Sequence, residues 1–383
     1  MPFRETTKMS EREEMVEQYE SGLYTVSELA KQYGVSRPTV YLWIGRSEAA
    51  EELVDRQPIA KSCPHATEQA VVERLLKAKH AKPQWGPAKQ RARLMKAYPD
   101  QVWPAVSTIG EIYEAHGLVK KRRKRRSRVA IRRIEQVQPA GSGEMMSCDH
   151  KGWFRLGNGR YCYPLTINEP FSRYIYAIDA LSSTSLEEAK PVFIRVFREY
   201  GVPAAMLSDN GGPFCCSRAL GGLTRLSVSW IKQGIVPTRI RKGCPWENGI
   251  HERMHKTLKA ETARPPQENQ RQQQKRFDEF RWEFNHERPH EAHGEQAPAS
   301  VFARCPREYS ETKAKADVEY PGHFEPRRVR HRGEIKWKGQ MLFVSESLAG
   351  EQVGLEETDD GVWTLHFADV ELGRYDARTR SLR

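Results

Sequence analysis

The sequence has little of the material from which membrane spans and disulfide frameworks are built. Its apolar runs stay well below the roughly 20 residues that cross a bilayer, and its N-terminus lacks the apolar segment of a secretory signal. Its seven cysteines are an odd number and include no C-x-x-C pair. Such thiols suit a reducing compartment better than a disulfide framework or a zinc ribbon. We therefore expect a cytoplasmic protein with no membrane partner.

Negative charge is also in short supply. The chain of 383 residues has 62 lysines and arginines against 50 aspartates and glutamates, a formal net charge of +12. An excess of this kind favours a polyanion as partner, although by itself it gives only salt-sensitive binding without regard to sequence. The length leaves room for about two to four domains. Nucleic acid is therefore the first partner to consider.

Residues 1–50 carry the pattern of a helix-turn-helix. The segments VSELAKQYG and SRPTVYLWI predict two helices joined at Gly34, with Ser36 as the N-cap and Pro38 in the first turn. The packing positions are expected to be Ala30, Val35, Val40 and Trp43. The outer face then carries the candidates for contacts to DNA, which are Arg37, Thr39, Tyr41 and Arg46. An ordinary three-helix bundle without a ligand is the alternative.

Residues 60–119 predict a second helix-turn-helix, with or without a wing. Its helices are expected in TEQAVVERLLKAKHA, in GPAKQRARLMKAY and in STIGEIYEAHG, which begins at the cap candidate Ser107 and ends at Gly117. A basic linker follows over residues 120–140, and ten of its side chains from 120 to 133 are basic. So dense a run resists packing into a core, and we expect it to follow DNA phosphates. The candidates are Lys120, Lys121, Arg122, Arg123, Arg125 and Arg126.

Residues 141–305 change to the pattern of an α/β domain with a mixed sheet. The runs YCYPLTI and RYIYAID are strand-like. The segment TSLEEAKPVFIRVFREYG opens with a capping box and places its apolar side chains on one helical stripe. A short strand, AAMLSD, then ends at Asp209.

Residues 320–383 predict a small β-barrel of the SH3-like kind. This part contains five or six short strand-like runs, and Asp360-Gly361 is a typical hairpin turn. Basic side chains are expected along its leading edge, namely Arg327, Arg328, Arg330, Arg332 and Lys336. The fold class expected for the whole chain is therefore multi-domain, with α, α/β and β parts in that order.

Three segments of the α/β domain combine a carboxylate with glycine and turn residues. These are SCDHKGWF with Asp149, LSDNGGPF with Asp209, and GCPWENGIHERMHKTLKAE with Glu252. Two aspartates at a sheet edge and a glutamate from a neighbouring helix can hold two hard cations and leave positions open for water and phosphate. Two such ions can promote an in-line displacement at a phosphodiester. Candidates for phosphate contacts on the same helix are His251, Arg253, His255, Lys256 and Lys259.

These stretches resemble the DDE transposases of bacterial insertion sequences, which are related to retroviral integrases and share an RNase H-like catalytic core. The resemblance rests on five segments in the family's order: SCDHKGWF, YPLTINEPFSRYI, LSDNGGPF, CPWENGIHERMHKTLKAE and FNHERPHEA. With WGPAKQRARL and PAVSTIGEIY it covers most of the chain. The sequence departs from the family at Asn168, where many relatives have aspartate outside the metal-binding triad.

The resemblance implies a transposase whose catalytic and metal-binding triad is Asp149, Asp209 and Glu252. It implies Mg²⁺ or Mn²⁺ as cofactor, as two ions, and double-stranded DNA as partner, both at the element's ends and at the target. Hydrolytic nicking at the ends, followed by attack of the freed 3′-hydroxyl on target DNA, is the implied reaction. A homo-oligomeric synaptic complex at the bacterial nucleoid is also implied.

Four alternatives remain open at this point. Glu247 lies five residues before Glu252, but in the family the catalytic glutamate is the one three residues after the glycine, here Gly249. The stretch from His251 to His255 also matches H-E-x-x-H, in which two histidines bind zinc and the glutamate acts as general base. A DNA-binding regulator without catalytic activity is the third alternative. Arg288 and His290 are either DNA contacts or parts of a structural cap.

Overall fold

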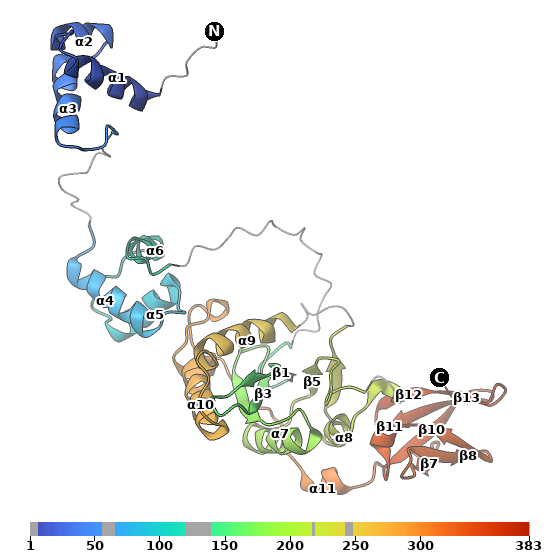
Figure 1. Ribbon diagram of the computed structural model, residues 1–383. Coiled ribbons are helices and arrows are strands. Elements are labelled where there is room, and N and C mark those ends of the chain that lie inside the picture. The colour runs from blue at the N-terminus through green and yellow to red at the C-terminus, as the bar shows by residue number, and fades with distance from the viewer. Residues whose placement is uncertain (1–6, 56–65, 120–138, 217–218, 242–247, 383) are drawn as a thin grey trace. The chain divides into compact units, whose positions relative to one another are not determined.

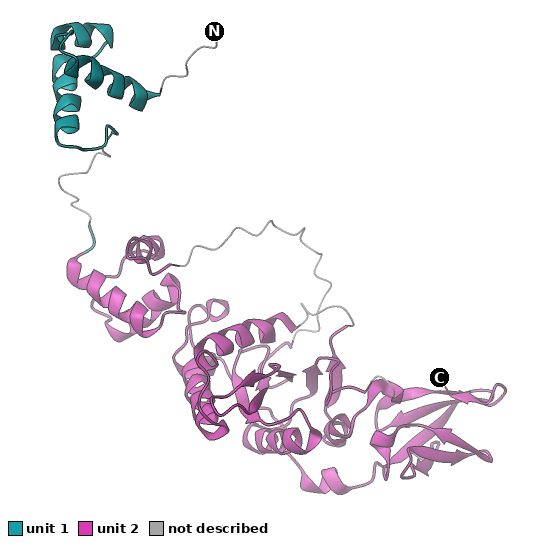
Figure 2. Ribbon diagram, in the orientation of Figure 1, with its two compact units in different colours: residues 1–67 teal, residues 68–383 magenta. Residues whose placement is uncertain are grey.

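The computed structural model describes residues 7–55, 66–119, 139–216, 219–241 and 248–382. It forms two compact units, residues 1–67 and 68–383, which are coloured separately in Figure 2. Most of the basic linker lies outside the described residues, including all six of its candidate phosphate contacts, and so does Glu247. Within the described ranges, no helix is both long enough and apolar enough to cross a membrane.

The first unit contains three helices, α1 (Lys8–Glu20), α2 (Val26–Gln32) and α3 (Arg37–Glu48). Gly34 has a φ of +65° in the turn between α2 and α3, a conformation that glycine adopts without strain. Ala30, Val40 and Trp43 are buried as expected. The prediction for Val35 is wrong, because its side chain is exposed. Ser36 is the N-cap residue of α3, but its hydroxyl bonds to the Thr39 hydroxyl rather than to a backbone N–H.

The second compact unit begins with three helices, α4 (Gln69–Ala81), α5 (Pro87–Ala97) and α6 (Val106–Ala115), which are called the second helical unit below. Leu75, Ile109 and Tyr113 are fully buried in its small core. Pro87 occupies the first turn of α5, where no amide donor is needed. The N-cap of α6 is Ala105, so the cap predicted at Ser107 is two residues late. Residues 66–119 contain no strand, and a wing is therefore absent from this described segment.

A mixed sheet forms the centre of the α/β part. Its strands are β1 (Met145–His150), β2 (Phe154–Arg155), β3 (Tyr161–Asn168), β4 (Ile175–Leu181), β5 (Ala205–Ser208) and β6 (Val236–Arg239). The order is β4-β3-β1-β5-β6, and β2 pairs with the beginning of β3. The pairs β4-β3 and β3-β1 are antiparallel, whereas β1-β5 and β5-β6 are parallel. The expected mixed sheet of an integrase-like core is confirmed.

Helices cover both faces of this sheet (Figure 1). On one face, α7 (Leu186–Tyr200) and α8 (Arg225–Lys232) contribute Phe193 and Trp230 to a cluster with sheet residues. On the other face, α9 (Gly249–Thr262) and α10 (Gln270–His286) contribute Met254 and Phe277. The α7 capping box is only half formed, because the Glu188 carboxylate accepts hydrogen bonds from Ser182 and Ser183 instead of Ser185.

The C-terminal part is β-rich, after the short helix α11 (Glu311–Lys315). One sheet has five strands in the order β13-β12-β11-β10-β7, and β8 pairs with β9 in a separate hairpin. These strands are β7 (Glu325–Arg328), β8 (Glu334–Trp337), β9 (Gln340–Phe343), β10 (Gln352–Asp359), β11 (Val362–Phe367), β12 (Val370–Asp376) and β13 (Ser381–Leu382). Asp360-Gly361 forms the two-residue loop between β10 and β11, as predicted.

Register shifts in the β10-β11 and β11-β12 pairs mark irregularities that curl the five-stranded sheet. The strand pairings among the described residues do not close it into a ring, so an SH3-like barrel is not confirmed. The strand β7 is an edge of this sheet, and it carries Arg327 and Arg328 where basic residues were expected.

Candidate active site

Two of the three candidate carboxylates lie side by side at the ends of parallel strands. Asp149 is near the end of β1, and Asp209 directly follows the last residue of β5. The two strands are neighbours, with Cys148 opposite Ser208. Both strands run in the same direction, and their carboxyl ends therefore place Asp149 and Asp209 at one edge of the sheet.

The third candidate, Glu252, lies near enough to Asp149 to affect its pKa. Burial raises the pKa of Asp149 to about 7, and the negative charges of Asp209 and Glu252 add to the rise, whereas Lys151 opposes it. Burial also raises the pKa of the Cys148 thiol, again with contributions from Asp149 and Asp209. Asp149 is therefore a partly buried carboxyl that lies within electrostatic range of two others.

Backbone and amide groups orient the two aspartates. The side-chain amide of Asn248, the N-cap of α9, donates to Asp149 Oδ2 at 3.2 Å. The backbone N–H of Gly211 donates to Asp209 Oδ1 at 3.1 Å. A Cβ atom at Gly211 would lie 3.0 Å from Asp209 Oδ2, so a larger residue there would crowd the carboxylate. The loop sequence thus fixes the direction of both carboxylates.

Helix α9 has two faces of different character. Glu252 lies in its first turn on the exposed face, together with the basic candidates Arg253, Lys256 and Lys259. Residues seven positions apart are separated by about 10 Å along a helix. The exposed face is therefore a short basic track that begins beside Glu252.

The opposite face of α9 carries the two histidines, and both are buried. His251 Nδ1 bonds to Ser147 Oγ at 2.8 Å, and the Nε2 atoms of His251 and His255 each lie 2.7 Å from Thr166 Oγ1. The Thr166 hydroxyl also donates to the backbone carbonyl of Asp149 at 2.9 Å. One assignment is compatible with these four hydrogen bonds: each Nε2–H donates to Thr166, and Ser147 donates to His251.

These contacts correct two predictions. His251 and His255 are not phosphate contacts, because they are buried against the sheet and burial lowers their pKa values to about 3 and about 2. The zinc-protease alternative also fails on geometry, since both ring nitrogens of His251 are already bonded and Glu252 lies on the exposed face. His255 Nδ1 is 3.7 Å from Asp149 Oδ2, but a neutral imidazole makes no ion pair there.

The donor set suits a hard divalent cation, because its ligands are all carboxylate oxygens. The charges of Asp209 and Glu252 both act on the carboxyl group of Asp149. The three are not drawn into a closed cluster: in the described ranges, no group of three or more histidine, cysteine, aspartate or glutamate side chains has the geometry to hold a metal ion. All five cysteines that the structure describes are free thiols, as expected.

The candidate DNA contacts on α3 divide into two kinds. Arg37 and Tyr41 are exposed, and Tyr41 keeps 60% of its surface accessible. Thr39 is half-buried and bonded to Ser36. Arg46 is held against its own unit, because it donates to the carbonyl of Val54 at 2.8 Å and its guanidinium lies 4.7 Å from the Trp43 ring centroid. The prediction that Arg46 is free on the outer face is therefore wrong.

Arg288 has a structural role. It is only 7% exposed, pairs with Glu261 at 3.0 Å and lies 5.8 Å from the ring centroid of Trp85 in the second helical unit. His290 is half-buried, and its backbone N–H bonds to the carbonyl of Gln296. Of the two interpretations of this motif, the cap network is the one that the contacts support.

Three residues of the site escaped prediction from the sequence. Ser147 and Thr166 hold the histidines, and Asn248 donates to the carboxylate of Asp149. Alternation along β1 could have indicated that Ser147 and Asp149 share a face. Thr166 is directly opposite Asp149 in the β1-β3 register, which no local pattern reveals.

Family models match three separate parts of the chain. Residues 11–60 match a helix-turn-helix domain, residues 233–298 match an integrase core domain, and residues 325–383 match the C-terminal domain of IS481 family transposases. The integrase core match includes α9 with Glu252. The chain therefore combines a helix-turn-helix part, an integrase core part and a C-terminal part that matches the C-terminal domain of IS481 family transposases.

Solved structures similar to this chain include retroviral integrases. The integrase catalytic core domain of HTLV-2, in complex with magnesium in a trimeric form, is 12% identical, with a TM-score of 0.34, and the match covers 43% of this chain and 99% of that chain. The intasome of simian T-cell lymphotropic virus, in complex with the PP2A regulatory subunit B56 gamma, is 13% identical, with a TM-score of 0.39. This match covers 73% of this chain and 97% of that chain.

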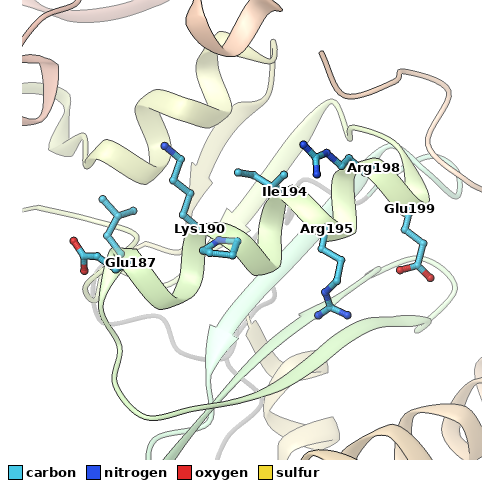
Figure 3. Close-up of a pocket in the computed structure, with 8 residues that line it drawn as sticks. Glu187, Lys190, Ile194, Arg195, Arg198 and Glu199 are labelled. Atoms are coloured by element: carbon cyan, nitrogen blue, oxygen red, sulfur yellow. The ribbon is translucent and has the colours of Figure 1, made fainter. Parts of the chain in front are cut away.

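A separate hollow of about 750 Å³ lies along α7 (Figure 3). All of its lining residues belong to that helix, from Leu186 to Glu199, and none is a candidate catalytic residue. Arg195 and Arg198 in this hollow already pair with Asp179 and Glu311. The carboxylates at the sheet edge, rather than this hollow, are therefore the candidate active site.

Proposed function

We propose that this chain is a transposase that binds the terminal inverted repeats of a mobile element, cleaves DNA strands at its ends and joins them to target DNA. The observation that carries the proposal is the meeting of Asp149 and Asp209 at adjacent strand ends, within electrostatic range of Glu252. A pure DNA-binding protein has no use for a partly buried carboxyl beside two others, since their repulsion costs stability unless a cation is bound.

The proposed ligands of Mg²⁺ or Mn²⁺, as two ions, are Asp149, Asp209 and Glu252. When bound, such ions supply an activated attacking oxygen and a stabilised leaving oxygen at the phosphodiester. The chain's own groups hold the carboxylates in position. Asn248 and the Gly211 N–H orient the two aspartates, and Thr166 fixes the backbone of Asp149.

DNA contacts are proposed on three surfaces. Arg37, Thr39 and Tyr41 of α3 contact base edges, and the basic run from Lys120 follows phosphates. Arg253, Lys256 and Lys259 hold the strand next to Glu252, because they share its exposed helix face. The C-terminal β part is proposed to complete an SH3-like fold, and the transposase to act as a homo-oligomer that brings two element ends together.

Metal dependence tests the proposal directly. Cleavage and joining of DNA carrying the element's ends should stop in EDTA and return with Mg²⁺ or Mn²⁺, since hard cations prefer oxygen ligands. Activity that survives EDTA, or returns only with Zn²⁺, contradicts the proposal. Specific binding to the ends without any cleavage under these conditions favours the non-catalytic regulator instead.

A further inference from the structure

Two large aromatic rings are exposed beside the candidate active site. Trp153 lies in the turn between β1 and β2, and Tyr161 begins β3. Trp153 is 61% exposed and Tyr161 is 40% exposed. Their ring centroids are 4.8 Å apart with nearly perpendicular planes. A single exposed aromatic residue needs no explanation, but an adjacent pair forms a patch that favours a ligand.

The pair is not needed to anchor its own hairpin. Phe154, the residue after Trp153, turns inward and packs edge-to-face against Phe277 of α10. It also pairs with Cys162, which is buried in the same cluster. The turn is therefore held by Phe154, and the exposed face of Trp153 remains available.

Basic side chains surround the two rings. The Arg155 guanidinium lies 5.3 Å from the Tyr161 ring centroid, and its Nη2 donates to the Tyr161 hydroxyl at 3.2 Å. Lys151 and Lys259 line one small hollow together with Trp153. A surface of flat aromatic rings between positive charges matches the chemistry of an unpaired nucleotide, whose base stacks and whose phosphate carries the negative charge.

The patch lies close to the carboxylates along two routes. Lys151 is two residues after Asp149 and acts on its charge. Lys259 is on the exposed face of α9, seven residues after Glu252, or about 10 Å along the helix. A strand whose phosphodiester lies at the carboxylates can therefore reach Trp153 within a few nucleotides.

We propose that Trp153 and Tyr161 form a stacking platform for an unpaired base of the DNA strand next to the scissile phosphodiester. This inference rests on the proposed function. It adds that the strand is single-stranded, or melted, on the side of the site where Lys259 lies. Lys151, Arg155 and Lys259 hold its phosphates, and Trp153 supplies most of the stacking surface.

The test compares binding of a short duplex with and without a single-stranded overhang, the overhang carrying 2-aminopurine, to the full chain in EDTA. Stacking on an aromatic ring quenches 2-aminopurine fluorescence, so the wild type should quench the probe and prefer the overhang. Trp153→Ala should lose the quench and weaken overhang binding by about tenfold, while binding of the blunt duplex stays unchanged. Trp153→Phe should retain most of both effects because it keeps a ring.

Trp282→Ala is the matched control, because Trp282 is also exposed but lies on α10. It should behave as the wild type. Equal thermal midpoints of Trp153→Ala and the wild type exclude misfolding of the variant. If the two midpoints differ, the binding and quenching of Trp153→Phe test the platform instead. Retention of the overhang preference and the quench in Trp153→Ala overturns the platform. Failure of the wild type to bind either duplex instead overturns the proposed function.

Discussion

The two helices that carry basic DNA-contact candidates, α3 and α9, are attached to their surroundings in different ways. Helix α3 packs through apolar side chains, chiefly Val40, Trp43 and Ile44. The inner face of α9 adds a polar layer, in which His251 and His255 bond to Ser147 and Thr166. Apolar contacts tolerate small shifts, whereas hydrogen bonds fix direction and distance.

This difference matches what each helix is proposed to do. A recognition helix reaches flexible side chains toward DNA and can adjust its position. A helix that supplies a metal-binding carboxylate must hold it close to its working position, because small errors cost rate. The hydrogen bonds from α9 to Thr166, which itself bonds to the backbone of Asp149, link two of the proposed ligands through one side chain.

The largest effect expected is at Glu252. Glu252→Gln removes a charge without changing the buried face of α9, and strand cleavage should fall by at least about a thousandfold, since several kcal/mol of charge stabilisation are lost. Binding of end DNA in a gel shift should remain. Asp149→Asn and Asp209→Asn should behave in the same way.

Glu247→Gln is the matched control for this prediction. It lies outside the described residues, and its variant should keep measurable cleavage activity. An inactive Glu247 variant beside an active Glu252 variant would show that the sequence assigns the wrong glutamate.

The next effect concerns the polar face of α9. Thr166→Val keeps the shape of the side chain but leaves two buried imidazole N–H groups and a carbonyl without their partner. We expect a loss of about 3 kcal/mol in the free energy of unfolding, because each unsatisfied buried group costs about 1–3 kcal/mol. Urea denaturation measures it.

Thr166→Ser retains the hydroxyl and should stay within about 1 kcal/mol of the wild type, since only a methyl group is lost. Equal stability of the Val and Ser variants would mean that the hydrogen bonds to the two histidines contribute nothing. The contrast between α3 and α9 would then disappear.

A smaller effect separates two arginines of α3. Arg37 is exposed, whereas Arg46 is bonded to Val54 and lies over Trp43. Arg37→Ala should weaken binding to the element's ends by about 1–3 kcal/mol more than binding to random DNA. Arg46→Ala should instead lower the thermal midpoint of the first unit and leave the ratio of the two affinities unchanged. Equal losses of specificity in both variants contradict this division.

The smallest effect is expected on the exposed face of α9. Lys256→Ala and Lys259→Ala each remove one proposed phosphate contact, so the slope of log affinity against log salt should fall by about one. Titrations at two salt concentrations measure the slope.

Replacing four basic residues between 120 and 133 should lower this salt slope by about four, again without regard to sequence. A linker variant that loses only end-specific binding is the outcome against this prediction.

Much of the fold could be predicted from local patterns. The α2-α3 turn at Gly34, the start of α5 at Pro87 and the loop at Asp360-Gly361 all follow from single residues with strong backbone preferences. The Ser107 cap and the exposure of Val35 were predicted wrongly, because a cap and a packing position depend on which neighbours the tertiary structure provides.

The candidate site shows the same limit. Glycine and asparagine beside Asp209 and Glu252 mark the loops that carry the carboxylates, and this much is local. The roles of Thr166 and Arg288 are not, since each depends on partners far away in the sequence. The H-E-x-x-H match illustrates the point, because spacing alone cannot distinguish histidines that face a metal from histidines that face a sheet.

Helix α8 has a consequence for how the chain can be divided. Leu226 and Trp230 pack with the core sheet, whereas Val228 and Ile231 pack with the C-terminal strands, and Lys232 pairs with Glu351 at 2.9 Å. Helix α8 therefore packs against the core sheet on one side and against the C-terminal strands on the other. Truncation before residue 320 should expose its second apolar face and produce an insoluble core. An exchange of C-terminal parts between related proteins should give a folded chain only when the α8 residues that pack against those strands, Val228 and Ile231, are exchanged as well.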